Sequence, residues 1–289
     1  LATSHPDSDF LQLNAQLPRD TQIRYRDGIR EVLAWEELAR TDANTKPWKD
    51  GGIYLITGGA GGIGAIMARE IAAQSNNSVL VLTGRSAMKP SIGKLIDELA
   101  ELGGTAVYRQ VDVTQEQAVR GLVDEILATY GGLNGVLHAA GITRDAHLLH
   151  KNERDFDAVL APKVTGTLNL DRATRHLDLD FLLLFSSLAG VSGNPGQGDY
   201  AAANGFMDNY AEYRNGLVVS GQRKGHTLSI NWPLWQEGGM QLSEEAQQLM
   251  RNRTGMVPLQ TPQAMAALSQ ALACGERQLS VMLGDITRL

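Results

Sequence analysis

Cysteine is almost absent from this chain of 289 residues, which contains Cys274 alone. A single cysteine excludes an internal disulfide framework and is typical of a reducing compartment, so we expect a cytoplasmic protein. Its thiol is better interpreted as a small buried apolar group than as a nucleophile. Clusters of basic residues are also missing, and the formal net charge is −6. We therefore expect no nucleic-acid partner.

Long apolar runs are missing as well. No stretch approaches the roughly 20 residues that a membrane-spanning helix needs, and no signal peptide opens the chain. We expect no membrane association and no metal site. The first residue is Leu1 and not Met, which suggests a piece of a longer protein. A hydrophobic content of 43% with 31 glycines is ordinary for an α/β protein with a proper core.

The first 48 residues differ in character from the rest. Within them, Gln22–Arg30 alternates like a strand pair around an Asp27-Gly28 turn. Two strands cannot bury a core alone, so this segment is expected to dock on the larger domain after it. We interpret residues 1–48 as the tail of a neighbouring module and residues 49–289 as the main domain.

From Gly52 onward, short apolar runs alternate with helical stretches. The predicted strands are 53–56, 78–83, 105–110, 135–138, 181–185, 227–231 and 278–282, and the predicted helices are 63–73, 91–102 and 115–130. This alternation implies right-handed crossovers. We expect an α/β fold with a Rossmann-like, doubly wound parallel sheet and helices on both faces.

A glycine-rich turn, Thr57–Gly64 (TGGAGGIG), follows the first of these strands. Its glycines permit a tight turn and a close approach of pyrophosphate, and the next helix offers free N–H groups to that anion. Such a turn can also be only a tight connection. Its place between a strand and a helix favours a dinucleotide site.

The second strand ends in Gly84-Arg85-Ser86. An NAD site offers an acidic residue here, whereas a guanidinium and a hydroxyl suit a 2′-phosphate. We therefore predict NADPH as the cofactor, although Arg85 elsewhere would be a solvated surface arginine. Asp112 could bond the adenine amino group, cap the helix beginning near Thr114, or do both.

The tripeptide after His138 (Ala139, Ala140 and Gly141) is small enough to let backbone lie against the cofactor. His138 itself invites a catalytic interpretation. Inside this motif we favour a packing and hydrogen-bonding role.

The candidate catalytic residues are Tyr200, Lys163, Ser187 and Asn204. Carbonyl reduction needs a hydride and a proton. A tyrosine of pKa near about 10 supplies the proton poorly unless a cation such as Lys163 is near. Ser187 can donate a second hydrogen bond to the substrate oxygen, and Asn204 follows Tyr200 by one helical turn. Taken singly, Tyr200 could be a core residue, Ser187 a turn residue and Asn204 a cap. Together with Lys163, they favour an active site.

With these motifs, residues 52–285 resemble the ketoreductase domain of a modular type I polyketide synthase, within the short-chain dehydrogenase/reductase superfamily. The matching motifs are Thr57–Gly64, Gly84–Ser86, His138–Gly141, Lys163–Gly166, Phe185–Gly190, Tyr200–Asn204 and Trp232–Met240. Most of the superfamily carries Tyr-x-x-x-Lys, and the lysine and asparagine transposed here are typical of the synthase branch. Asn194–Tyr200 and Asn204–Asp208 further resemble synthases served by a separate acyltransferase, the trans-acyltransferase type.

The resemblance implies NADPH-dependent reduction of a β-ketoacyl thioester, carried on the phosphopantetheine arm of an acyl carrier protein, beside neighbouring synthase domains. Residues 1–48 would be the C-terminal end of the family's structural subdomain. Residues 236–257 would form a mobile lid over the substrate, with a helix over 242–250. The lid could instead be a simple amphipathic surface helix. The implied cofactor contacts are Thr57, Gly58, Gly59, Gly62, Ile63, Gly64, Arg85, Ser86, Asp112, Val113, Ala139, Ala140, Gly141 and Pro233.

Fewer sequence features indicate the stereochemistry of the product. In the family, a Leu-Asp-Asp triplet marks enzymes giving the D-hydroxyl product, and a tryptophan at the position of Ser192 marks the L product. This chain has Thr143-Arg144-Asp145 and lacks the tryptophan, which favours D, with Arg144 as the departure. Gln197 and Met240 are further candidates for substrate and stereochemical control.

Two other functions fit parts of the sequence. A free-standing reductase for small ketones would use the same chemistry, but the missing start methionine and the strand pair argue against it. A catalytically silent scaffold should have a broken tetrad or cofactor loop, and both are intact here.

Overall fold

The computed structural model describes residues 8–18, 20, 22–39, 46–240, 242–285 and 287–288. The chain divides into two compact units, Leu1–Arg40 and Thr41–Leu289. We describe each unit by itself.

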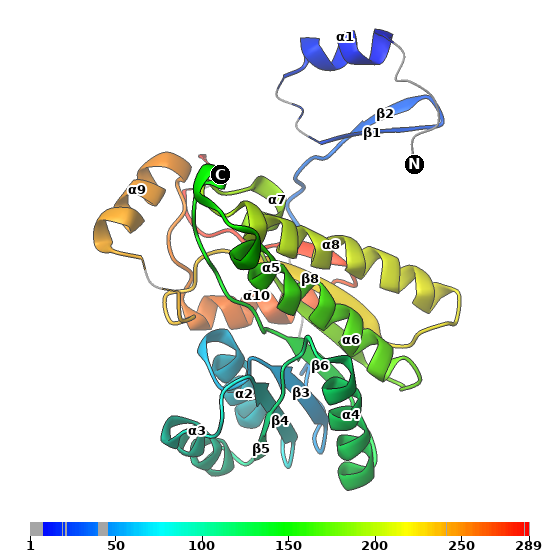
Figure 1. Ribbon diagram of the computed structural model, residues 1–289, viewed down its shortest axis with the longest axis vertical. Helices are drawn as coiled ribbons and strands as arrows, with labels where there is room; N and C mark the ends of the chain where they lie inside the picture. The colour runs from blue at the N-terminus through cyan, green and yellow to red at the C-terminus, as the bar shows by residue number, and fades with distance from the viewer. Residues whose placement is uncertain are drawn as a thin grey trace. The chain divides into compact units, whose positions relative to one another are not determined.

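The first unit contains a short helix and the predicted strand pair (Figure 1). Helix α1 spans Ser8–Gln16, and strands β1 (Ile23–Arg26) and β2 (Ile29–Val32) pair in antiparallel register. The two turn residues, Asp27 and Gly28, have φ angles of 51° and 78°. Both angles lie in the left-handed region that a tight two-residue hairpin requires, which explains the Asp-Gly sequence.

The second unit is built on a seven-stranded parallel sheet of order β5-β4-β3-β6-β7-β8-β9. Its strands are β3 (Ile53–Thr57), β4 (Val79–Gly84), β5 (Thr105–Gln110), β6 (Gly135–His138), β7 (Phe181–Ser187), β8 (His226–Trp232) and β9 (Gln278–Ser280). Every strand predicted from an apolar run is present, and the doubly wound, Rossmann-like fold is confirmed. The strand order reverses between β3 and β6, where such sheets open a crevice at their carboxyl ends.

Helices cover both faces of this sheet (Figure 1). One face carries α2 (Gly62–Gln74), α3 (Pro90–Glu101) and α10 (Thr261–Ala273). The other carries α4 (Glu116–Tyr130), α6 (Thr165–Thr174) and α8 (Gly198–Val219), with α5 (Glu153–Lys163) packed on α6 and α8. The remaining elements are the short η1 (Leu148–His150) and α7 (Leu188–Ser192), and the helix α9 (Glu244–Thr254).

Alternating residues of the strands divide the core between the two faces. In β3, Tyr54 and Ile56 belong to the cluster under α2, α3 and α10, whereas Leu55 belongs to the cluster under α4, α6 and α8. Burial on both faces explains why these strands are continuous apolar runs. Trp48 closes one end of the core, with its ring 5.8 Å from the rings of Tyr54 and Phe181.

Within the described part of the chain, none of the helices is both long and apolar enough to cross a membrane.

Candidate functional site

Close backbone packing explains the glycines of the loop between β3 and α2. Gly58 has a φ of +68°, and a Cβ there would lie 3.0 Å from the carbonyl oxygen of Ala139. A Cβ on Gly64 would overlap the carbonyl of Gly58. The loop therefore tolerates no side chain at either position, and it passes directly beside the end of β6.

The first turn of α2 is open to an anion. Its N-cap, Gly61, makes no side-chain capping bond, and no acidic residue occupies this first turn among the residues described. The first backbone N–H groups of a helix lack partners within the helix, and the helix dipole favours negative charge there. The loop and helix thus fit a pyrophosphate group.

The turn after β4 is fixed from the neighbouring strand β5. The hydroxyl of Tyr108 donates to the carbonyl oxygen of Ser86 at 2.6 Å, and the Gln110 amide donates to the carbonyl oxygen of Arg85 at 3.0 Å. The backbone of the turn is held while both side chains remain exposed. An exposed guanidinium and hydroxyl at the carboxyl end of β4 fit a 2′-phosphate.

Asp112 closes a turn and does not cap a helix. Its Oδ1 accepts hydrogen bonds from the amide and the hydroxyl of Thr114 at 2.9 and 2.8 Å. Helix α4 begins only at Glu116, with Gln115 at the N-cap position. The predicted capping role near Thr114 is therefore wrong, because the backbone makes a separate turn before the helix starts. Val113, the next residue, is buried.

His138 is held in a buried hydrogen-bond network. Its Nδ1 lies 2.7 Å from the hydroxyl of Thr57, and its Nε2 lies 2.9 Å from the carbonyl oxygen of Pro162. Burial, followed by the nearby Lys163 charge, lowers the pKa of His138 to about 3. A neutral ring with Nε2–H donating satisfies both contacts. The Thr57 oxygen also accepts from the amide of Ala140 at 3.3 Å, so this network supports the backbone beside the glycine loop.

The four candidate catalytic residues converge from three elements. Lys163 ends α5, Ser187 ends β7 and caps α7, and α8 carries both Tyr200 and Asn204. The Lys163 Nζ lies 5.7 Å from the centroid of the Tyr200 ring and donates to the carbonyl oxygen of Phe185 at 2.8 Å. The Asn204 amide donates to the backbone oxygen of Tyr200 at 2.7 Å.

Burial dominates the electrostatics of this group. Desolvation lowers the pKa of Lys163 to about 8, against the opposing effect of Asp208. Burial raises the pKa of Tyr200, while hydrogen bonds with the Ser187 and Asn204 side chains lower it. The lysine charge is therefore poised near neutral pH beside the tyrosine.

Sequence reasoning missed Asp208, which follows Asn204 by one turn on α8. Its carboxylate is 6% exposed and accepts from the Ser229 hydroxyl at 2.6 Å and the Asn231 amide at 2.8 Å. Burial raises the pKa of Asp208, against these hydrogen bonds. The signal in the sequence was the four-residue spacing of Tyr200, Asn204 and Asp208. Among the described residues, the buried Oδ1 of Asn204 has no partner.

A helix lies in the segment predicted to form a lid, and it is displaced toward the C-terminus from its predicted bounds. The expected helix over 242–250 is observed as α9, because the Ser243 side chain caps it by accepting from the amide of Ala246 at 3.2 Å. The first part of the 236–257 segment lies against the glycine-rich loop between β3 and α2, since a Cβ on Gly62 would overlap the carbonyl oxygen of Gly238. Met240 is 42% exposed at this position. Pro233 is half-buried immediately after β8.

Apart from Met240, the candidate stereocontrol residues lie in two neighbouring stretches, after β6 and from the end of α7 to the start of α8. The carboxylate of Asp145 accepts from the Gln197 amide at 2.8 Å. The exposed Arg144 lies 3.9 Å from the Asp155 carboxylate, and the Ser192 hydroxyl donates to the carbonyl oxygen of Leu188 at 2.9 Å. Asp145 and Gln197 are thus brought together, whereas Arg144 and Ser192 make contacts of their own.

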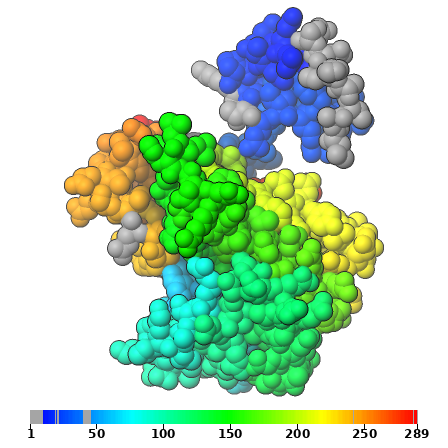
Figure 2. All heavy atoms as spheres, viewed as in Figure 1, coloured from blue at the N-terminus to red at the C-terminus, as the bar shows by residue number. Residues whose placement is uncertain are grey.

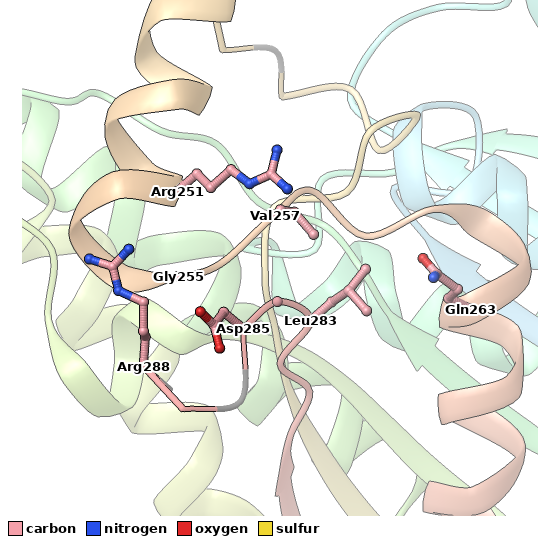
Figure 3. Close-up of a pocket in the computed structure, with 8 residues that line it drawn as sticks. Arg251, Gly255, Val257, Gln263, Leu283, Asp285 and Arg288 are labelled. Atoms are coloured by element: carbon pink, nitrogen blue, oxygen red, sulfur yellow. The ribbon is translucent and has the colours of Figure 1, made fainter.

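Two surface hollows lie near the lid. The one in Figure 3 is lined by Arg251, Gly255, Val257, Gln263, Leu283, Gly284, Asp285 and Arg288. The first three belong to the predicted lid segment, and none of the eight is a predicted catalytic, cofactor-binding or stereocontrol residue. The other lies between the lid and the segment after β8, and Met240 is one of its walls. Only the second hollow adjoins a predicted site residue.

Comparisons with known proteins agree with this geometry. Residues 52–237 match the family model of the KR domain. The chain is 46% identical over 278 residues to polyketide synthase PksN of Bacillus subtilis (strain 168), which covers 96% of this chain but 5% of that protein. It is 44% identical over 282 residues to polyketide synthase PksL of the same organism, covering 97% of this chain and 6% of PksL.

Among solved structures, a ketoreductase domain from the bacillaene assembly line superposes with a TM-score of 0.93 at 44% identity, covering 96% of this chain and 66% of that one. The chain thus spans a small fraction of its synthase relatives and about two thirds of an isolated domain. On these matches, the chain belongs to the ketoreductase (KR) domain family of polyketide synthases, a family of oxidoreductases.

Proposed function

We propose that this domain uses NADPH to reduce a β-ketoacyl thioester to the β-hydroxyacyl thioester while the acyl chain is attached to the phosphopantetheine arm of an acyl carrier protein. The observation that carries the proposal is the convergence of Tyr200, Ser187, Lys163 and Asn204 at the sheet end that holds the glycine loop. Bound NADPH would supply the hydride for the carbonyl carbon.

The residues of the chain would manage the proton and the developing charge. Tyr200 donates its hydroxyl proton to the carbonyl oxygen, and Ser187 donates a hydrogen bond to the same oxygen. A charged Lys163 stabilises the tyrosinate that proton donation leaves. Asn204, which bonds the backbone of Tyr200 at 2.7 Å, holds that turn of α8 and keeps a buried oxygen for a further donor.

The cofactor preference follows from two places in the fold. The glycine loop and the first turn of α2 would bind the pyrophosphate, and Arg85 with Ser86 would bind the 2′-phosphate. Asp112, Val113, Ala139, Ala140, Gly141 and Pro233 would complete the cofactor contacts, since they lie at the ends of β5, β6 and β8.

For the hand of the product we propose the D-hydroxyl. Asp145 is the acidic residue retained from the triplet, and it accepts a hydrogen bond at 2.8 Å from Gln197, in the loop that leads to Tyr200. Residues 236–257 would act as the lid, with Met240 facing the substrate side.

Residues 1–48 would be the end of a structural subdomain and residues 49–289 the catalytic domain, acting beside other synthase domains. Cys274, which is half-buried and unpaired with another cysteine, is compatible with a reducing, cytoplasmic setting.

The test is NADPH oxidation with a β-ketoacyl-cysteamine thioester and with the same acyl group on a carrier protein, followed by chiral analysis. Tyr200→Phe should lower turnover by at least about 100-fold, the lower range of general acid catalysis, and leave the Kd of NADPH unchanged. Tyr213→Phe, at an exposed tyrosine on the same helix, is the control. Unaltered turnover in Tyr200→Phe would remove the proposal.

A further inference from the structure

The segment from Thr143 to Lys151 lies against the first turn of α8, the helix that carries Tyr200. Apolar burial does not hold this segment in place, because its two leucines, Leu148 and Leu149, are 72% and 94% exposed. In Figure 2 it is part of the green prominence on the visible face. Something other than a hydrophobic core must fix its position.

Two of its contacts with the loop before α8 are not fully buried. The amide of Ala146 donates to the carbonyl oxygen of Gly196 at 2.9 Å, and the Gln197 amide donates to the exposed Asp145 carboxylate at 2.8 Å. Hydrogen bonds that compete with water contribute little to holding a loop. These contacts set the register of the segment but do not make it rigid.

The third contact is a buried ion pair. The Nζ of Lys151 lies 2.7 Å from Oδ2 of Asp199, and the two side chains are 5% and 0% exposed. The same Nζ donates to the carbonyl oxygen of Arg144, and the other oxygen of Asp199 accepts from the amide of Tyr200 at 2.9 Å. A continuous path of hydrogen bonds therefore joins the backbone of Arg144 to the backbone of Tyr200.

On the basis of the function proposed above, we propose that Lys151 and Asp199 are positioning residues for stereochemical control. Neither touches the reacting atoms. The pair fixes the segment that carries Asp145 with respect to Tyr200, so that the substrate presents one face of its carbonyl to the hydride. A site that discriminates between the two faces of a carbonyl needs the residues around the substrate held to a fraction of an ångström. Buried contacts behind those residues, such as this ion pair, provide that precision.

The energetics of buried ion pairs make this role testable. Removing one partner leaves an uncompensated buried charge and destabilises the fold, whereas replacing both partners is often tolerated. In the double variant Lys151→Met with Asp199→Asn, the asparagine oxygen can still accept from the amide of Tyr200. That variant removes the path to Arg144 and keeps the first turn of α8.

The experiment uses the full chain, the double variant and a control, Lys224→Met, which removes the lysine of an exposed ion pair with Asp178. Hydrogen exchange of the 143–151 amides, the Kd of NADPH and the enantiomer ratio with a β-ketoacyl-cysteamine thioester are measured. In the double variant we expect faster exchange and a rise of at least about tenfold in the minor enantiomer, which corresponds to 1.4 kcal/mol. The NADPH Kd and the control should be unchanged.

A folded double variant with unaltered exchange, or with faster exchange but an unaltered enantiomer ratio, overturns the inference. If the unaltered chain reduces no thioester, the proposed function fails and the stereochemical role fails with it. Hydrogen exchange still decides whether the ion pair tethers the segment. If Lys151→Met alone fails to fold, the double variant carries the test.

Discussion

Burial lowers the pKa of Lys163 and also destabilises the folded state. The side chain is 4% exposed, and desolvation lowers its pKa to about 8 from 10.5. Between these two pH values the unfolded chain binds more protons than the folded chain, so stability rises with pH across this window. Below pH 8 the full penalty applies, on the order of 3 kcal/mol at 1.36 kcal/mol per pKa unit.

We therefore expect Lys163→Met to raise the free energy of unfolding at pH 7 while NADPH oxidation falls by at least about 100-fold. The stabilisation relative to the unaltered chain should shrink as pH rises from 8 to 10. Urea unfolding at pH 7 and pH 10 measures both values. Lys224→Met, at an exposed ion pair, should change neither value. A Lys163→Met variant that is less stable than its parent at pH 7 would contradict this account.

Sequence spacing predicted some of the residues that meet at this site and missed others. Tyr200 and Asn204 lie one helical turn apart, and Ser187 ends an apolar strand, so their positions follow from local periodicity. Lys151 and Asp199 are far apart in the sequence. Their pairing depends on which loops the fold brings together, and each alone resembles an ordinary surface charge. Asp208 was missed because an acidic residue on a helix is more often exposed than buried.

Strand β5 holds the turn after β4 in place, because its side chains bond the backbone of that turn. Strand β5 supplies both groups that bond the backbone of Arg85 and Ser86, and the Tyr108 hydroxyl is the shorter contact at 2.6 Å. Losing one such hydrogen bond costs about 1 kcal/mol. The turn would then be less well placed for the proposed contact with a 2′-phosphate. The loss of the hydrogen bond should therefore weaken the binding of NADPH more than that of NADH.

Tyr108→Phe is thus expected to reduce the ratio of the NADH Kd to the NADPH Kd by about fivefold, the equivalent of 1 kcal/mol. Fluorescence titration with both cofactors measures the ratio. Tyr213→Phe, at a tyrosine that is 58% exposed, serves as the control. Equal weakening of both cofactors would mean that Tyr108 supports the sheet and not the phosphate site.

The contact between the predicted lid segment and the glycine-rich loop is the basis of a second prediction, which concerns cofactor binding. Gly62 has a φ of +44°, and its missing side chain leaves room for the carbonyl of Gly238. Gly62→Ala should strain the loop by about 1–3 kcal/mol and displace the first residues of the lid, so the Kd of NADPH should rise at least about fivefold. Gly93→Ala, where a Cβ would meet nothing within 4 Å, is the matched control. An unchanged Kd would show that the lid and loop move independently.

The elements that the sequence predicted are those with a simple signal. Apolar runs bounded by polar residues predicted all seven strands of the sheet, because a doubly covered sheet buries both faces. Helices α5, α6, α8 and α10 received no predicted bounds. Their buried positions include polar residues such as Asn169 and Asp208, whose partners lie on other elements. The start of α9 depended on the Ser243 cap, which hydrophobic periodicity does not reveal.

At the scale of the whole molecule, the buried apolar residues among those described divide unevenly between the two compact units. Among the residues that the structure describes, the three clusters of buried hydrophobic residues lie within the second unit, from Trp48 to Ala271. The strands β1 and β2 form a two-stranded sheet of their own, separate from the seven-stranded one. The stability of the second unit should therefore come from its own core.

A chain that begins at Thr41 is accordingly expected to fold, to bind NADPH with the Kd of the full chain, and to unfold within about 4 °C of it, the shift that 1 kcal/mol produces in a larger domain. Thermal unfolding and cofactor titration of the two chains test this. A chain that begins at Gly51 provides the contrast, because it lacks Trp48, whose ring packs 5.8 Å from Tyr54 and Phe181. Losing a buried aromatic side chain costs about 3–5 kcal/mol, so this shorter chain should unfold at a clearly lower temperature. Equal destabilisation of both chains would mean that the first 40 residues contribute to the catalytic unit's stability.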